Sequence, residues 1–249
     1  MKRNDYPKVL VGIVTYEGKH YIFPKCYEAV KSFSYPNYDW VIIDNSESTK
    51  YYHKLRRLDY KNVKHIKREE HSRDTLSKSQ NYIRQIAVDE GYDYVLFVES
   101  DLIPPTGIIE RLMAYNVPVV GSTYFIGTGK VKLPCIFLEH KIGVMKGTRL
   151  IGTIPESFDR DAKKVLNIKE VEDFLGTGLR QVHGCGLGTM LVRTSILKRF
   201  PFWTDERFDN KHSDVYWYMD LSNNSIPVYV DTNIIIPHYP SKWDDVKDR

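Results

Sequence analysis

The sequence predicts a single-domain α/β protein whose mixed, mainly parallel sheet is flanked by helices and doubly wound in the Rossmann-like, nucleotide-binding manner. In residues 1–125, short apolar runs rich in β-branched residues alternate with segments whose apolar residues recur at helical spacing. Several of those runs end in acidic residues, as strands do where ligands bind at the carboxyl edge of a parallel sheet. A chain of 249 residues is long enough for one such domain.

Composition and cysteine usage exclude several classes of protein. With 42% hydrophobic and 27% charged residues, the chain is typical of globular rather than disordered proteins. No apolar run approaches the length of a membrane span, and the start leads directly into a predicted strand, leaving no room for a signal peptide. The widely separated Cys26, Cys135 and Cys185 are typical of a reduced intracellular protein. We therefore expect no transmembrane segment and a cytoplasmic location, in the host cytoplasm if the source is viral.

The first elements form a strand–helix–strand unit. A buried strand is expected at Lys8–Glu17, ending in small and polar residues. A helix follows from about Phe23 to Phe33, with Pro24 in its first turn, and a second strand covers Trp40–Ser46 with Asp44 near its end. Two strands joined by a helix of this length are parallel, with a right-handed crossover.

Residues 50–73 are basic, with nine Lys or Arg against three acids, and include a short strand near Val63–Ile66. A solvated surface is the favoured interpretation of this charge. The alternative is contact with phosphates or a polyanion, in which case binding would weaken steeply with salt.

The strand Tyr94–Asp101 is the centre of the functional interpretation. It follows a helix expected over Ser77–Asp89, and its five consecutive apolar residues predict burial on both faces. Its end carries Glu99 and Asp101, which are two residues apart and therefore project to the same side. An acid-x-acid pair in this position suits a divalent cation with oxygen ligands. The alternative, of equal weight, is a solvated strand end in which the acids only stop the strand.

Regularity is lost after a helix at 108–113, capped by Thr106, and a strand at Val117–Phe125. Residues 126–180 are rich in Gly, Lys and Asp and show little periodicity apart from a short helix around Ile168–Phe174. We expect an excursion and a mobile loop here rather than a second domain.

Order returns in residues 181–249. At Gln181–Val192 the glycines are spaced G-x-G-x-G before an apolar run, which does not match the dinucleotide fingerprint and favours close approach of the backbone to a ligand. Two helices, a strand and an apolar run that ends in a histidine follow: Ser195–Phe200, Asp214–Leu221, Val228–Asp231 and Ile234–His238.

The order of these parts resembles the family 2-like GT-A glycosyltransferases over nearly the whole chain, in the small stand-alone form found in viruses and microbes. Glu99-Ser100-Asp101 stands at the DxD motif of that family, and Asp44 at the acid after its second strand. The most specific match is a series in the last third: Gly186-Leu187-Gly188-Thr189-Met190-Leu191-Val192-Arg193, Pro201-Phe202-Trp203, Ser213-Asp214-Val215-Tyr216-Trp217, Val228-Tyr229-Val230-Asp231 and His238. The resemblance implies one GT-A domain over 1–249, with the nucleotide-sugar bound by 1–125 and the acceptor by 181–249.

Two positions depart from the family's pattern. Glu99 replaces the first Asp of DxD, which is compatible with Asp101 as the direct metal ligand and Glu99 on ribose or water. Ser213 replaces the first acid of the usual E-D pair. The remaining acid, Asp214, is then a candidate base without the neighbour that would orient it or the acceptor.

The resemblance implies a nucleotide-sugar donor, with a UDP-sugar favoured, and Mn²⁺ or Mg²⁺ as cofactor. Asp101 and His238 would hold the cation, whose Lewis acidity stabilises the departing diphosphate. For His238 the alternative is a strand-end histidine in an ordinary hydrogen bond. The other donor-binding candidates lie at the ends of the first two strands and in the acid-x-acid motif: Thr15, Tyr16, Glu17, Asp44, Glu99 and Ser100. Arg73 and Lys78 are candidates for the diphosphate, and an ordinary surface position is an equally weighted alternative for each.

Asp214 would be the general base, taking a proton from the acceptor hydroxyl in a single displacement that inverts configuration. The alternative is a helix N-terminal acid that interacts with the macrodipole. The acceptor-binding candidates are Gly186, Leu187, Gly188, Trp203 and Trp217. Both indoles are either stacking platforms or core residues. The acceptor is a glycan, a lipid-linked saccharide, a protein or a modified DNA base, and the oligomeric state is not readable from the sequence.

Two other functions compete with this interpretation. A non-catalytic GT-A-type module would bind a nucleotide-sugar or glycan without transfer, and is motivated by Ser213. The variant Asp214→Ala separates the two, because loss of turnover with retained donor binding identifies the enzyme. A nucleotidyltransferase ranks lower, since the chain lacks a Gly-rich, basic loop after its first strand.

Overall fold

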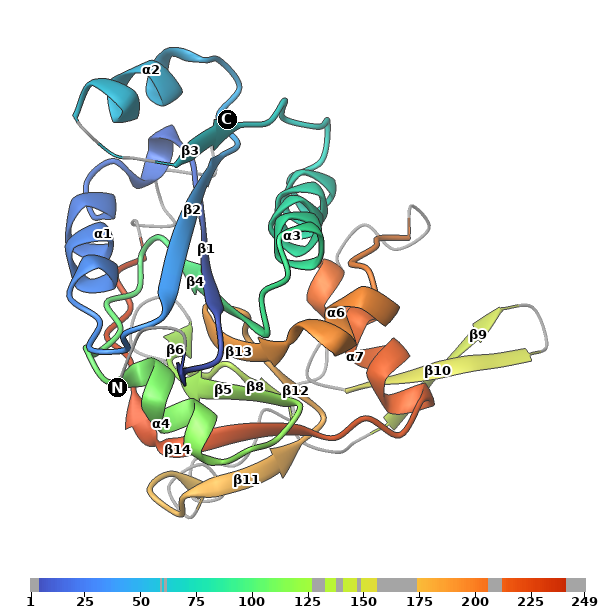
Figure 1. Ribbon diagram of the computed structural model, residues 1–249. Helices are drawn as coiled ribbons and strands as arrows, with labels where there is room; N and C mark the ends of the chain where they lie inside the picture. The colour runs from blue at the N-terminus through green and yellow to red at the C-terminus, as the bar shows by residue number, and fades with distance from the viewer. Residues whose placement is uncertain are drawn as a thin grey trace.

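The computed structural model describes residues 5–58, 60, 62–126, 133–137, 141–146, 149–155, 174–205 and 212–240 (Figure 1). Its main feature is an eight-stranded sheet in the order β11-β14-β5-β13-β4-β1-β2-β3. In chain order these strands are β1 (Val9–Thr15), β2 (Tyr38–Asp44), β3 (Val63–His65), β4 (Tyr94–Glu99), β5 (Val119–Thr123), β11 (Leu179–Val182), β13 (Thr189–Arg193) and β14 (Val228–Ile235).

The sheet is mixed and mainly parallel, as the sequence predicts. Strands β3, β2, β1 and β4 are parallel neighbours. Strand β13 runs antiparallel between β4 and β5, β14 is parallel to β5, and β11 closes the edge antiparallel to β14. The α/β class is therefore confirmed. The antiparallel strand β13 is not predicted by the alternation of strands and helices in residues 1–125.

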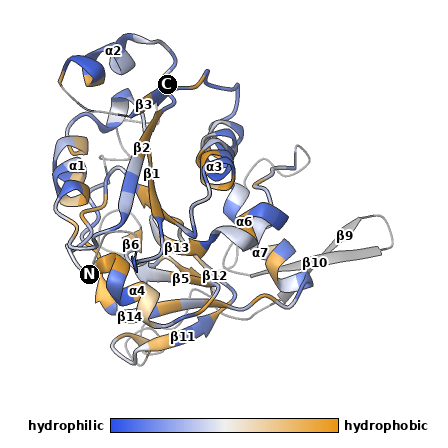
Figure 2. Ribbon diagram, in the orientation of Figure 1, coloured by the Kyte–Doolittle hydropathy of each residue, from blue (hydrophilic) through white to orange (hydrophobic). Residues whose placement is uncertain are grey.

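Helices cover both faces of the sheet (Figure 1). One face carries α1 (Phe23–Lys31), α2 (Lys50–Arg57) and α4 (Ile108–Ala114), and the other α3 (Ser72–Asp89), α6 (Thr194–Arg199) and α7 (Ser213–Asn223). Figure 2 shows hydrophobic colour concentrated on the inner strands, while the helices carry both colours. None of the helices in the described part of the chain is both long and apolar enough to cross a bilayer.

Alternation along β1 explains how one strand serves two cores. Val9, Val11 and Ile13 pack into the cluster that contains α1 and α4, whereas Leu10 packs into the cluster that contains α3. Gly12 lies on the α3 side, where an added Cβ would stand 2.5 Å from Ile83 Cγ2. The missing side chain thus lets α3 pack directly on the sheet.

Several element boundaries differ from the prediction. Helix α2 occupies the basic segment, for which the sequence predicts a solvated surface and no helix; of its residues only Tyr51 and Leu55 are buried. Helix α3 begins at Ser72 rather than Ser77. The predicted helix at Ile168–Phe174 lies almost wholly outside the described residues.

The region expected to be an excursion contains short strands. These are β6 (Phe125–Ile126), β7 (Leu133–Pro134), β8 (Ile136–Phe137), β9 (Lys141–Lys146) and β10 (Arg149–Pro155). Strands β9 and β10 pair antiparallel, and Figure 1 shows them extending from the body of the molecule beside α7. The short strand β8 pairs with β12 (Gly184–Cys185), which ties the region back to the glycine-rich segment.

Candidate functional site

The strand register places three predicted donor-binding residues at one edge of the sheet. Thr15 at the end of β1 pairs with Asp44 of β2, and Val14 pairs with Glu99 of β4. Because these strands are parallel, their carboxyl ends meet at this edge, which is the ligand-binding edge in open α/β sheets. Hydrogen bonding from Glu99 N–H to Gly188 O, at 2.9 Å, brings the start of β13 to the same place.

The chain after β14 adds a histidine to this edge. An isolated bridge joins Leu102 to His238, and Tyr239 N–H donates to Asp101 O at 2.9 Å. Ligand atoms of Glu99, Asp101 and His238 lie within 4.8 Å of one another, and we call these three residues the acid–histidine cluster. The predicted pairing of His238 with Asp101 is thus present, and Glu99 joins it.

Hydrogen bonding fixes the orientation of the His238 ring. Its Nδ1–H donates to the carbonyl of Phe125 at 2.7 Å, and its Nε2 stands 3.2 Å from Asp101 Oδ2. The ring also packs edge-on against Tyr124, with 5.4 Å between ring centroids. Since a carbonyl only accepts, Nδ1 carries hydrogen, and Nε2 faces the carboxylate either with a proton or as a lone pair. A ring whose Nδ1–H is held by a backbone carbonyl, which leaves Nε2 for a metal, is the usual arrangement of a metal-binding histidine.

Electrostatics of the acid–histidine cluster favour a cation. Burial, and then the neighbouring charge of Asp101, raise the pKa of Glu99 from 4.5 to about 7. Burial alone would raise the pKa of Asp101, but hydrogen bonds and charges from His238 and Lys19 outweigh it and lower that pKa. Two carboxylates and one imidazole are a donor set that suits Mn²⁺ and tolerates Mg²⁺. The residues present therefore fit a divalent cation.

Lys19 is a member of the site that the sequence analysis missed. It ends a short 3₁₀ helix, η2 (Glu17–Lys19), directly after β1, and its Nζ donates to Asp101 Oδ2 at 2.5 Å. The Lys19 side chain is 19% exposed. Lys19 lies four residues beyond the end of β1 and close to the predicted donor-binding residues Tyr16 and Glu17, and this position is the signal in the sequence that could have identified it.

The nucleoside end of the predicted site is organised by Asp44. Its Oδ1 accepts from Ser46 N–H at 3.1 Å and Ser46 Oγ–H at 2.6 Å, while its Oδ2 accepts from His65 Nδ1–H at 2.9 Å. Asp44 is fully buried, so as placed here it orients Ser46 and His65 rather than meeting a ligand directly. Ser46 Oγ in turn accepts from Glu17 N–H at 2.9 Å, which holds η2 against the end of β2.

The remaining donor-binding candidates have varied surroundings. Tyr16 is half-buried, and the Arg68 guanidinium lies 5.8 Å from its ring centroid. Arg73 is buried in the first turn of α3, with its Nε 3.7 Å from Asp74 Oδ1. Lys78 forms an exposed ion pair with Glu69. A role for Arg73 or Lys78 on a diphosphate remains a prediction.

Asp214 lies in the first turn of α7 and within electrostatic reach of the acid–histidine cluster. Burial raises the pKa of Glu99, Tyr124 and Cys135, and the charge of Asp214 adds to each rise. Burial raises the pKa of Asp214 itself, exceeding the opposing influence of His212. Its Oδ1 accepts from Val215 N–H at 2.9 Å, as a helix N-terminal acid does. Both predicted roles therefore remain compatible with its position.

The glycine-rich segment packs against protein rather than exposing backbone to a ligand. A Cβ on Gly186 would stand 1.8 Å from the Tyr124 hydroxyl, and one on Gly188 would stand 2.3 Å from Leu102 Cδ1. Leu187 between them is buried. The expectation that these three residues bind the acceptor is therefore corrected: the glycines make room for Tyr124 and Leu102, which lie behind His238 and Asp101.

The two candidate tryptophans differ in burial: Trp217 lies in the core and Trp203 is partly exposed. Trp217 is fully buried, stacks on Phe202 at 5.1 Å between centroids, and donates its Nε1–H to Phe200 O. This corrects the expectation of an acceptor platform at Trp217, which is a core residue. Trp203 is half-buried and donates its Nε1–H to Asp220 Oδ2 at 2.7 Å, so it stays a candidate platform.

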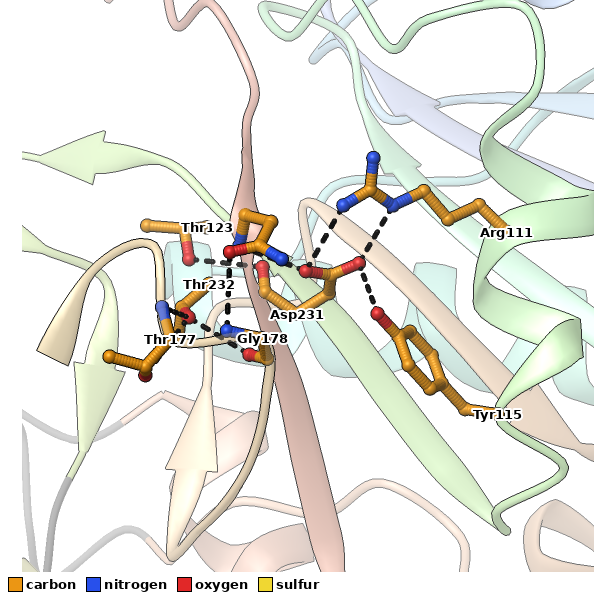
Figure 3. A network of polar contacts seen from close by, with 8 residues as sticks. Arg111, Tyr115, Thr123, Thr177, Gly178, Asp231 and Thr232 are labelled. Atoms are coloured by element: carbon orange, nitrogen blue, oxygen red, sulfur yellow. Dashed lines mark hydrogen bonds and ion pairs between the residues drawn. The ribbon is translucent and has the colours of Figure 1, made fainter.

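The acid of the Y-V-D motif belongs to a separate polar network (Figure 3). Asp231 is fully buried and accepts from Arg111 Nε–H at 2.8 Å, Tyr115 O–H at 2.7 Å and Asn233 N–H at 2.9 Å. The adjacent Thr232 bonds to the turn before β11 through Gly178 O. This network ties α4 and β11 to β14, and so has a structural role.

The fold is shared with a solved glycosyltransferase. Similarity to TarS from S. aureus, a GT-A glycosyltransferase, extends over 96% of this chain and 38% of TarS, at 16% identity and a TM-score of 0.54. The 1–349 fragment of TarS in complex with UDP-GlcNAc matches 95% of this chain over 60% of its own length, at 15% identity and a TM-score of 0.54. The protein A197 from STIV aligns over 94% of this chain and 87% of its own, at 14% identity and a TM-score of 0.45.

These similarities extend to architecture but not to sequence. No protein-family model matches the chain, and no curated protein matches its sequence. The chain spans less than two thirds of TarS or of its fragment. At such low identity the likeness establishes the GT-A fold, which agrees with the mixed sheet and its flanking helices.

Proposed function

We propose that the chain is a metal-dependent, inverting glycosyltransferase that moves a sugar from a nucleotide-sugar, with a UDP-sugar favoured, to an acceptor hydroxyl. The observation that carries the proposal is the acid–histidine cluster at the carboxyl edge of a GT-A sheet. Complexes of the TarS fragment with UDP-GlcNAc and with UDP support the choice of donor.

On the donor side, Asp101 and His238 would hold Mn²⁺ or Mg²⁺, with Glu99 beside them. Such a cation would supply Lewis-acid stabilisation of the charge that develops on the departing diphosphate. The chain's own contribution is orientation, since the Phe125 carbonyl fixes the His238 ring and Tyr239 N–H holds the backbone of Asp101. Both groups are thus in place before a donor arrives.

The nucleoside would be received by the ends of β1, β2 and β3. Thr15, Tyr16 and Glu17 follow one another there, and Asp44 holds His65 and Ser46 beside them. The Tyr16 ring is a face on which a base can stack. His65, oriented through its Nδ1, adds a polar group for the base or ribose.

On the acceptor side, Asp214 would take the proton from the attacking hydroxyl. Its raised pKa suits this task, because a general base works best when its pKa lies near the operating pH. Attack from the face opposite the leaving group inverts the anomeric centre. A glycan, a lipid-linked saccharide, a protein or a modified DNA base are all acceptors that this arrangement allows.

A second candidate function follows from Ser213. It stands where the family's first acid would be, is fully buried, and donates its hydroxyl to Gln80 Oε1 at 2.6 Å. A residue used this way contributes nothing to acceptor orientation, which favours a binding module without transfer. Donor hydrolysis or transfer by the wild type, lost in Asp214→Ala with UDP binding intact, would exclude the module. Wild-type protein that binds UDP-sugars and never turns them over would establish it.

The experiment that tests the proposal is thermal melting with a panel of nucleotides and nucleotide-sugars, with and without Mn²⁺. A ligand at 100 times its Kd adds roughly 2.7 kcal/mol, which raises Tm by several degrees in a domain of this size. We expect the rise with UDP and UDP-sugars only when Mn²⁺ is present. Absence of any nucleotide effect would contradict the proposal.

A further inference from the structure

Lys19 and His238 contact the same oxygen of Asp101. The ammonium donates to Oδ2 at 2.5 Å, and His238 Nε2 stands 3.2 Å from that atom. Lys19 therefore supplies the positive charge that balances this carboxylate in the structure. The side chain reaches the cluster from η2, outside the sheet, while the cluster itself is built on β4 and the segment after β14.

A divalent cation bound to Asp101 would conflict with this ion pair. Like charges repel, and a divalent ion repels the ammonium twice as strongly as a monovalent ion does at the same distance. Lysine is suited to yield, because its charge is compact and its four-carbon stem is flexible. The anion that would arrive with the cation is the donor diphosphate, and Lys19 is partly exposed at the edge where it would bind.

We propose that Lys19 is a positioning residue that exchanges Asp101 for the donor diphosphate when the metal and nucleotide bind. The inference rests on the proposed function and extends it to a residue outside the family's motifs. Lys19 would thus weaken metal binding in the absence of nucleotide and strengthen nucleotide binding in the presence of metal. The coupling makes occupation of the site by metal alone less favourable than occupation by metal and diphosphate together.

The test uses Lys19→Met, which keeps the length and apolar character of the stem and removes the charge. Lys31→Met is the matched control, because Lys31 also pairs with a carboxylate, Glu28 at 3.1 Å, but on the exposed end of α1. Isothermal titration calorimetry measures Mn²⁺ binding alone and then UDP binding at saturating Mn²⁺. We expect Lys19→Met to bind Mn²⁺ on the order of tenfold more tightly and UDP on the order of tenfold more weakly.

The opposite signs of the two changes identify the exchange. Lys19→Arg should recover UDP binding in part, and Lys31→Met should match the wild type in both titrations. Lys19→Met that loses affinity for both ligands would show a merely structural role and overturn the inference. If the wild type binds both ligands and Lys19→Met binds Mn²⁺ or UDP with unchanged affinity, the proposed exchange by Lys19 would be overturned and the proposed function would stand. Failure of wild type and Lys19→Met alike to bind Mn²⁺ would overturn the proposed function as well.

Discussion

Two carboxylate centres lie on the same sheet, with β5 and β13 between their strands, and they are built in opposite ways. Asp231 on β14 is met by the guanidinium of Arg111, the hydroxyl of Tyr115 and a backbone N–H, so its oxygens have protein donors (Figure 3). At the end of β4, Glu99 and Asp101 face each other and His238 within 4.8 Å. The first centre is a single carboxylate satisfied by protein donors, whereas the second brings two carboxylates together with His238 and Lys19.

The pKa directions express this difference. Burial alone would raise the pKa of Asp231, but its donors outweigh burial and lower it. Burial raises the pKa of Glu99 to about 7, and Asp101 reinforces that rise. Buried charge is costly unless it is paired: Lys19 and His238 pair with Asp101, whereas at Glu99 burial and the charge of Asp101 outweigh them. Asp231 and Asp101 are both buried, but among the described residues only the cluster of Glu99, Asp101 and His238 could hold a metal ion.

The largest expected effect breaks the second centre. Asp101→Asn removes the charge shared by Lys19 and His238, and we expect Mn²⁺ affinity to fall by on the order of 100-fold or more. UDP binding should lose its dependence on Mn²⁺. Calorimetric titration checks both statements. A variant that binds Mn²⁺ as the wild type does would remove Asp101 from the metal site.

A change behind the second centre should act on it through packing. In Gly188→Ala the new Cβ would stand 2.3 Å from Leu102 Cδ1 and 2.9 Å from the Tyr124 ring. We therefore expect the free energy of unfolding to fall by about 1–3 kcal/mol and Mn²⁺ binding to weaken. Gly107→Ala is the control, since its Cβ would have only Ser34 Oγ nearby, at 3.9 Å. Denaturant unfolding measures both. Equal stability of the two variants would contradict the packing argument.

Breaking the first centre should affect stability but leave the metal site intact. Asp231→Asn keeps the shape of the side chain and removes its charge. We expect the free energy of unfolding to fall by about 1–2 kcal/mol, and no more, because the half-exposed Arg111 can be solvated by water instead. Mn²⁺ affinity should equal that of the wild type. Reduced Mn²⁺ affinity at unchanged Tm would show that the two centres are not separate.

The smallest effect concerns pH. The folded state keeps a proton on Glu99 up to about pH 7, whereas the unfolded state releases it near pH 4.5, so stability falls as pH rises between these values. Burial alone would lower the pKa of His238, but Asp101 outweighs it and raises that pKa above 6.5, so this contribution is also lost with rising pH. We expect the metal-free Tm to fall by on the order of a few degrees from pH 5.5 to 8.

Glu99→Gln should flatten that decline, and Glu28→Gln, on the exposed face of α1, should not. Added Mn²⁺ should reverse the trend, since the ion binds the deprotonated groups and stabilises more as pH rises. A metal-free Tm that climbs steadily over this range would contradict the assigned pKa directions.

The sequence predicted the fold class and the strand that carries the site because both depend on local patterns. Apolar runs and their acidic ends are readable along the chain, and Glu99 and Asp101 were found in that way. The antiparallel direction of β13 depends on long-range pairing with β4 and β5, which periodicity does not encode. Helix α2 was missed because few of its residues are buried.

Within the site, the misses share one cause, which is that packing partners are distant in sequence. Gly186 and Gly188 resemble ligand-binding glycines until Tyr124 is placed against them. Trp217 resembles a platform until Phe202 covers it. Lys19 is one of many lysines until η2 brings it onto Asp101, 82 residues away. Residue type and spacing thus identify candidates, and tertiary contacts separate structural residues from functional ones.

The assignment of Asp101 and His238 as metal ligands is tested most directly by an anomalous-difference map from crystals grown with Mn²⁺ and UDP. We expect one strong peak within roughly 2.0–2.3 Å of an Asp101 oxygen and His238 Nε2, with the diphosphate on its open side. Asp231 should carry no peak. Ordered UDP without a peak at the acid–histidine cluster, or a peak elsewhere, would contradict the assignment of this cluster as the metal centre of a nucleotide-sugar site.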